Sequence, residues 1–204
     1  MEHAVRAREI KWIFHFTRIE NLHSILSDGI IPREYLEANK AKVEYNDRLR
    51  LDGQEKASCF SIGHPNYKMF YSLRQQNTEQ EWVVIACKIE ILWLKDCAFC
   101  QENAASNNVT CIPLQHRKGI AAFEKLFEPI EGKPSRGELG LPASYPTNPQ
   151  AEVLIFNVIE PTYIIGAYCQ TKDRANSLKE TYPGFQFVYK ESPFSYRRDY
   201  AHWK

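Results

Sequence analysis

Apolar and polar side chains alternate near the start of the chain, where residues 10–17 read IKWIFHFT. Successive side chains of a β-strand point to opposite faces, so this stretch predicts a strand. One face of that strand is strongly apolar, and His15 and Thr17 lie side by side on the other.

The residues that follow predict a helix that begins at once. Thr17 and Glu20 have the spacing of a capping box, in which each side chain bonds a backbone N–H of the first turn. Gly29 has the place of the residue that ends the helix. An apolar stripe at helical spacing runs between them, and its members are Ile19, Leu22, Ile25 and Leu26.

Further periodic segments predict a mixed architecture. Strands are expected at 58–62, 82–89, 153–159, 163–168 and 185–189, and helices at 67–73, 121–127 and 173–180. Residues 95–114 are expected to be mostly loop. Because strands follow one another near the C-terminus, the pattern predicts a single α/β (α+β) domain rather than a doubly wound sheet.

The segment 149–156, PQAEVLIF, places a lone carboxylate at the entrance of an apolar run. Residues 128–149, directly upstream, are rich in proline and glycine, and a loop of this length in a compact domain is usually functional. Glu152 would share a strand face with Leu154 and Phe156, at the rim of a buried surface. Half-desolvated carboxylates of this kind are common catalytic acids. A polar residue at a strand end on a solvated edge would give the same sequence pattern.

The composition excludes some classes of function but does not identify one. The chain has 204 residues, 44% of them hydrophobic, and a formal net charge of +1, so any nucleic-acid surface must be local. The N-terminus is charged, and no apolar run approaches the roughly 20 residues of a membrane helix, so we expect a cytoplasmic protein without a membrane partner. Cys97 and Cys100 form a single CxxC without the second pair that a zinc ribbon needs, and no metal is expected.

Two further features can be interpreted either as functional or as structural. Arg48 and Arg50 offer guanidinium forks for phosphate or carboxylate, or they belong to a solvated charged loop. Residues 64–71, HPNYKMFY, hold aromatic rings at helical spacing, which could stack on a heterocycle or pack in the core. The sequence contains no Walker loop, GxGxxG, HExxH or GxSxG motif.

In this order, the features resemble an ADP-ribosyltransferase. The block HFTRIENLHSIL at 15–26, followed by Gly29, is similar to the opening of the DarT family of DNA ADP-ribosyltransferase toxins. Residues 66–71 and the Gln150-Ala151-Glu152 triplet stand where that family has its aromatic segment and its catalytic glutamate. The resemblance covers about residues 10 to 190, and it implies an ADP-ribosyltransferase-like fold with a split mixed β-sheet and flanking helices.

The resemblance also implies roles for individual residues. Glu152 and Arg50 would be catalytic, with Arg48 as the alternative to Arg50. The NAD⁺ site would include His15, Phe16, Thr17, Asn21, Ser24, Arg50 and Tyr71. Residues 33–53 would embrace NAD⁺, which is a substrate here, and residues 128–150 would present the acceptor, with Gln150, Arg136 and Lys133 as its contacts. The tail at 196–200 is a further candidate for DNA, or a packed terminus.

The resemblance leaves the acceptor open. Thymidine-directed members carry a PRSPMLY-like segment where this chain reads HPNYKMFY, which favours guanine over thymine in single-stranded DNA. Such a toxin would be a monomer paired with a macrodomain antitoxin of the DarG kind. The alternatives are transfer to RNA or protein, a phosphate-transferring relative of the same fold, and a catalytically inactive module that binds NAD⁺ or nucleic acid.

Overall fold

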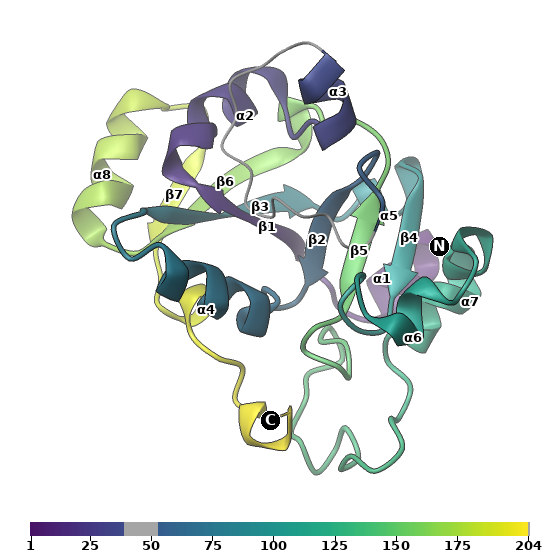
Figure 1. Cartoon of the computed structure of the whole chain (residues 1–204). Helices are drawn as coiled ribbons and strands as arrows, with labels where there is room; N and C mark the ends of the chain where they lie inside the picture. Colours follow the sequence, from purple (N-terminus) through teal and green to yellow (C-terminus); the bar gives the residue numbers. More distant parts are fainter. Residues whose placement is uncertain (39–52, 204) are drawn as a thin grey trace.

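The computed structural model describes residues 1–38 and 53–203 of the chain. A seven-stranded sheet runs through it in the order β4-β5-β2-β1-β3-β6-β7 (Figure 1). Its strands are β1 (Trp12–Arg18), β2 (Ser58–Ile62), β3 (Trp82–Lys88), β4 (Cys97–Cys100), β5 (Glu152–Ile155), β6 (Ile164–Cys169) and β7 (Gln186–Tyr189). β6 and β7 are parallel and the other neighbours are antiparallel, so the sheet is mixed.

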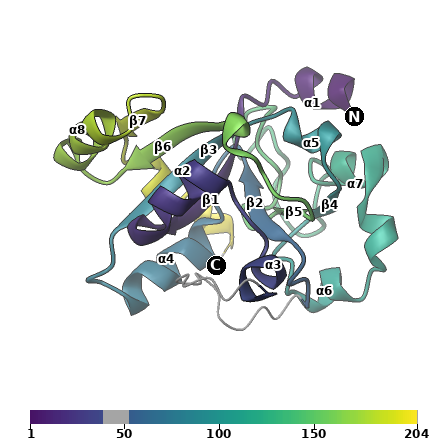
Figure 2. The ribbon, with the colours of Figure 1, turned by 90° about the horizontal axis from the view of Figure 1, so that it is seen from above.

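Helices cover both faces of this sheet. They are α1 (Glu2–Ala7), α2 (Leu22–Asp28), α3 (Arg33–Ala38), α4 (Tyr67–Gln76), α5 (Ile91–Leu94), α6 (Asn107–Thr110), α7 (Gly119–Lys125) and α8 (Lys172–Thr181). Figures 1 and 2 show α2 and α4 on opposite sides of β1 and β3. In the described residues, no helix has the length and apolar character to cross a bilayer.

The sheet is split between β1 and β2. β1 pairs with β3 along its whole length, from Trp12 to Arg18, but it pairs with β2 only at Ile13 and Phe14. Beyond Phe14 the two strands part, and β2, β5 and β4 form a second half of the sheet. This geometry confirms the expected split mixed sheet.

Each face of the sheet has its own core. The face that carries Ile13, Val83 and Val153 packs on α1, α2, α5, α7 and α8. The opposite face carries Phe14 and Phe16 against α4, and Leu154 against the segment that contains α6. Phe16 stacks on Phe70 of α4 with ring centroids 4.5 Å apart, a contact that contributes about 1 kcal/mol beyond area burial.

Most predicted elements are confirmed, within a few residues at their ends. The capping box is wrong: Thr17 still belongs to β1, and the chain makes a 3₁₀ turn, η1 (Ile19–Asn21), before α2 begins. Gly29 ends α2 as expected, with φ of 93°. The loop predicted at 95–114 contains β4, which adds a strand to the sheet beside β5. Residues 128–151 form no helix or strand, as the sequence indicated.

Candidate active site

Glu152 lies at the first position of β5 and is 4% exposed. Its Oε1 accepts hydrogen bonds from Asn66 Nδ2 at 2.9 Å and from Asn103 Nδ2 at 3.4 Å. Its Oε2 accepts from the backbone N–H of Ala104 at 2.8 Å. Hydrogen bonds to a carboxylate stabilise its ionised form and fix its orientation, so the surroundings hold a buried negative charge in place.

Asn66 connects this carboxylate to α4. Its side chain is fully buried, and its Oδ1 accepts from the Met69 N–H at 3.3 Å as the N-cap of the helix. Its own N–H donates to Ser61 Oγ at 3.0 Å. The same amide that begins α4 therefore also donates to Glu152, which places the first turn of α4 beside the carboxylate.

The expected NAD⁺-binding residues gather at the end of β1 and the start of α2. Thr17 is 1% exposed, and its Oγ1 accepts from Asn21 Nδ2 at 3.1 Å. The Ser24 hydroxyl donates to the Asn21 carbonyl oxygen at 3.0 Å. His15 Nδ1 lies 2.9 Å from the carbonyl oxygen of Cys59, so this nitrogen carries the proton that is donated across the split.

These two groups of residues belong to opposite faces of the sheet. His15 and Thr17 alternate with Phe14 and Phe16, which pack toward α4, so their side chains project toward α2. Glu152 projects toward α4 through its bond to Asn66. β1 and β2 stop pairing after Phe14, between the strands that carry these two groups of residues.

The remaining expected residues are placed as follows. Phe16 packs on Phe70, and Tyr71 points outward from α4 with 57% of its surface exposed. Arg48 and Arg50, and residues 39–52 of the expected NAD⁺-embracing segment, lie outside the described residues.

The expected acceptor contacts lie on the long loop. Arg136 donates from Nη1 to the Tyr145 carbonyl at 2.7 Å and from Nη2 to the Pro142 carbonyl at 2.9 Å, so it braces the loop. Lys133 Nζ donates to the His202 carbonyl at 2.8 Å. Gln150 is half-buried, two residues before Glu152. The sequence did not indicate these carbonyl contacts, because carbonyl positions have no signature in the residue types.

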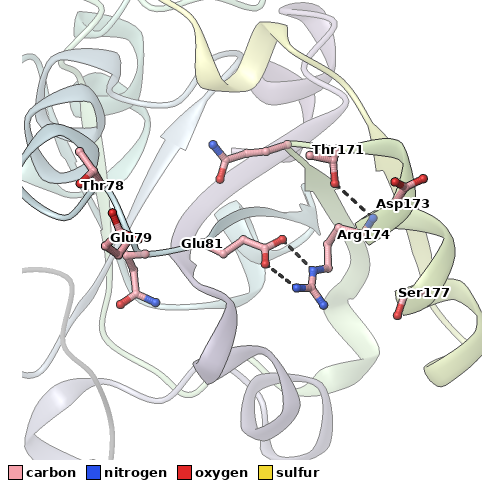
Figure 3. A pocket seen from close by; sticks show the side chains of 9 residues that line it. Thr78, Glu79, Glu81, Thr171, Asp173, Arg174 and Ser177 are labelled. Atoms are coloured by element: carbon pink, nitrogen blue, oxygen red, sulfur yellow. Dashed lines mark hydrogen bonds and ion pairs between the residues drawn. The ribbon is translucent and has the colours of Figure 1, made fainter.

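A separate hollow lies just before the start of β3, where Trp82 pairs with Arg18 of β1, between that turn and the start of α8 (Figure 3). Glu81 accepts two hydrogen bonds from Arg174 there, at 2.7 and 2.6 Å, and Thr171 Oγ1 accepts from the Arg174 N–H as the N-cap of α8. Of the expected site residues that the structure describes, none lines this hollow. Within residues 1–38 and 53–203, no group of His, Cys, Asp and Glu side chains has the arrangement to hold a metal ion.

A known protein family matches most of this chain. The model of the family described as "ssDNA thymidine ADP-ribosyltransferase, DarT" matches residues 14–199. The chain belongs to the DarT family. No curated protein sequence matches this DarT-family chain.

Solved DarT structures share the fold. Thermosipho africanus DarTG in complex with ADP-ribose is 18% identical, with a TM-score of 0.64 over 90% of this chain and 51% of the other. This chain therefore spans about half of the Thermosipho chain. Thermus sp. 2.9 DarT in complex with NAD⁺ is 14% identical, with a TM-score of 0.56 over 92% of this chain and 98% of the other. The same Thermus protein in complex with ADP-ribosylated ssDNA gives 13% identity and a TM-score of 0.54, over 92% of this chain and 97% of the other.

Proposed function

We propose that this chain transfers a single ADP-ribose from NAD⁺ to a base in single-stranded DNA. The observation that supports this most directly is Glu152, a buried carboxylate at the start of β5 with hydrogen-bond donors on both oxygens. Family membership and the Thermus DarT complexes with NAD⁺ and with ADP-ribosylated ssDNA support it independently.

The chemistry needs one carboxylate. When the bond between nicotinamide and the ribose C1′ breaks, its electron pair leaves with nicotinamide and positive charge develops on the ribose. Glu152 accepts a hydrogen bond from the ribose 2′-hydroxyl and stabilises that charge. A base nitrogen then forms the new bond to C1′ and releases its N–H proton to solvent. The pair of carboxylates found in most glycosidases is not required, because the acceptor is the base rather than an activated water.

Residues from both faces of the sheet take part in NAD⁺ binding and transfer. Thr17, Asn21 and Ser24 on the α2 face, with His15 at the split, hold NAD⁺, and Phe16 contributes through its backbone. Tyr71 is exposed on α4 and packs on nicotinamide. Arg50, or Arg48 in its place, neutralises the pyrophosphate or orients the acceptor base. It does not serve as a general base, because a guanidinium is too weak an acid to give up its proton at neutral pH.

The acceptor is single-stranded, because a base nitrogen within a duplex cannot reach a buried carboxylate without flipping out. The loop 128–150 presents this strand, with contacts from Gln150, Arg136 and Lys133. The segment HPNYKMFY at 64–71 departs from the thymidine-directed pattern and favours guanine, whereas the matched family model is described for thymidine. Parallel oligonucleotides that differ in one base decide between them.

The test incubates the full chain with labelled NAD⁺ and single-stranded oligonucleotides that contain one guanine or one thymine. Transfer of label to DNA is expected, and Glu152→Gln should reduce it at least about 100-fold while NAD⁺ binding changes little, because the amide keeps the shape but loses the charge. Near-normal transfer by Glu152→Gln would contradict the assignment. Label on RNA or protein instead would indicate the other acceptors, and no label would indicate a binding module.

We further propose that the chain is the toxin of a toxin–antitoxin pair and acts as a monomer. Modification of bases is harmful to the cell that makes the enzyme, so a second activity must remove the adduct. A macrodomain hydrolase of the DarG kind is the expected partner, and the similarity to the Thermosipho protein named DarTG supports this pairing.

A further inference from the structure

Residues 192–203, which we call the C-terminal strap, run from α4 to the long loop that precedes Glu152 (Figure 1). At its start, Arg74 Nη2 donates to the Phe194 carbonyl at 2.5 Å. His64 Nε2 lies 3.0 Å from the Ser192 carbonyl oxygen. The strap is thus attached to the same helix whose first turn holds Glu152.

One face of the strap is buried and forms hydrogen bonds with the backbone of the loop. Arg197, which is 4% exposed, donates to the carbonyl oxygens of Pro146 and Thr147, each at 2.7 Å. Asp199 accepts from Arg197 at 2.6 Å on both of its oxygens, and from Trp203 Nε1 at 2.7 Å. Thr147 stands five residues before Glu152, so this buried ion pair fixes the backbone that leads into the catalytic strand.

The other face of the strap is exposed, because its side chains alternate with the buried pair. Tyr196 and Tyr200 are 61% and 39% exposed, with ring centroids 4.1 Å apart, and the exposed Arg198 stands between them in the sequence. The side chain of an exposed tyrosine is usually mobile. Here the buried ion pair of Arg197 and Asp199 anchors the backbone that carries them, so the two rings and the cation project from an anchored segment beside the loop.

We propose that Tyr196, Arg198 and Tyr200 form a subsite for nucleotides that flank the target base in the single strand. This inference rests on the proposed function. Aromatic side chains stack on any base, and an arginine pairs with the phosphate between two bases, which is the equipment of sites that bind single strands without reading their sequence. The subsite holds the strand while the base a few nucleotides away enters the split sheet.

The test compares the full chain with Tyr196→Ala/Tyr200→Ala and Tyr196→Phe/Tyr200→Phe, using a fluorescent single-stranded DNA of about 12 nucleotides, within the range of sites that track a single strand. The alanine pair should weaken DNA binding about tenfold to 100-fold and raise KM for the oligonucleotide without a comparable loss of kcat. The phenylalanine pair keeps the rings and should bind within about twofold of wild type. Arg198→Ala should lower the dependence of binding on salt concentration.

Trp12→Ala is the matched control, since it removes an aromatic side chain that is 40% exposed at the far end of β1. It should bind DNA as wild type does, and thermal unfolding checks that every variant is folded. Equal affinity of the alanine pair and wild type would overturn the subsite while transfer by wild type upholds the proposed function. If wild type transfers nothing to DNA, both proposals fail. If the alanine pair lowers affinity for RNA and leaves that for DNA unchanged, the strand is RNA and the DNA subsite is wrong.

Discussion

Asn66 illustrates how much one amide contributes to this site. Its oxygen caps α4, and its nitrogen donates to Glu152 at 2.9 Å. A capping residue can be read from sequence, since an asparagine before an apolar-periodic segment is a common helix start. Its second bond cannot be read in this way, because the partner is 86 residues away in the chain. The amide nitrogen is the part of Asn66 that contacts the proposed catalytic carboxylate.

Replacement of Asn66 by aspartate should separate these two roles. Aspartate still caps the helix, but it puts a second carboxylate within hydrogen-bond distance of Glu152, and two such groups resist ionising together. The pair therefore titrates in two steps, and its fully ionised form is reached only at higher pH. Transfer at pH 7 should fall at least about tenfold, and the acid limb of the rate profile should move to higher pH.

Thr171→Asp is the control for Asn66→Asp. It changes the N-cap of α8, where Thr171 accepts from the Arg174 N–H, and it leaves the surroundings of Glu152 alone. Its pH profile should match that of wild type. An unchanged acid limb in Asn66→Asp would mean that Glu152 is not the group whose ionisation limits transfer.

At the scale of the element, Gly29 ends α2 in a conformation that glycine alone adopts easily. Its φ is 93°, and a Cβ there would lie 2.2 Å from the Ile159 carbonyl oxygen. Ile30 forms a bridge with Ile159 directly after it, so the backbone has no room to move aside. Gly29→Ala should lower the free energy of unfolding by more than about 1 kcal/mol, measured by urea denaturation.

Gly140→Ala tests the cost of backbone strain without a steric contact of the new Cβ. Gly140 has a φ of 60°, but a Cβ added there would have no atom within 4 Å of it. This variant should therefore lose only the backbone contribution, about 1 kcal/mol. If the two variants lose the same stability, the contact with Ile159 has no energetic weight.

The strap predicts a specific response to acid. Burial opposes ionisation of Asp199, but the hydrogen bonds and positive charge of Arg197, together with the hydrogen bond from Trp203, outweigh it and hold the pKa of Asp199 below its usual value. A lowered folded-state pKa contributes stability above about pH 4, the unfolded value, and that stability is lost as pH falls through the folded-state pKa. Asp199→Asn leaves Arg197 buried without its counter-charge and should cost about 3 kcal/mol at neutral pH.

Urea denaturation between about pH 7 and pH 3 tests this expectation. Wild type should lose stability more steeply below about pH 4 than Asp199→Asn does, because the variant lacks the titrating group. Glu131→Gln changes an exposed carboxylate of the loop that Arg197 contacts and should follow the wild-type curve. Parallel curves for wild type and Asp199→Asn would contradict the role of the ion pair.

The sequence predicted some strands well even though most of their residues are buried. β2 was expected at 58–62 and occupies Ser58–Ile62. β4 was missed because its four residues are all buried and too short to show a period, and only the pairing with β5 makes them a strand. The capping box failed because Thr17 is retained by β1, whose ladder with β3 continues to Arg18. Long-range pairing outweighed a local capping signal.

At the scale of the molecule, the proposed NAD⁺-binding residues and the proposed catalytic carboxylate lie on opposite faces of the split sheet. Thr17 bonds Asn21 on the α2 face, and Glu152 bonds Asn66 on the α4 face, so the described residues form two half-sites with different hydrogen-bond partners. The sequence indicated both halves through His15, Thr17 and Glu152. It did not indicate that they lie on opposite faces, because that depends on the strand order β5-β2-β1.

This separation predicts how two mutations combine. Thr17→Val keeps the shape, removes the hydrogen bond from Asn21 and should cost about 1 kcal/mol of stability. It should raise KM for NAD⁺ about fivefold with little change in kcat, whereas Glu152→Gln should lower kcat and leave KM nearly unchanged. In the double variant, the losses of unfolding free energy should add to within about 0.5 kcal/mol, since the two side chains bond different residues on opposite faces. Urea denaturation without NAD⁺ measures this sum. A larger deviation would show that the two half-sites are coupled before NAD⁺ binds, and that the split does not isolate them.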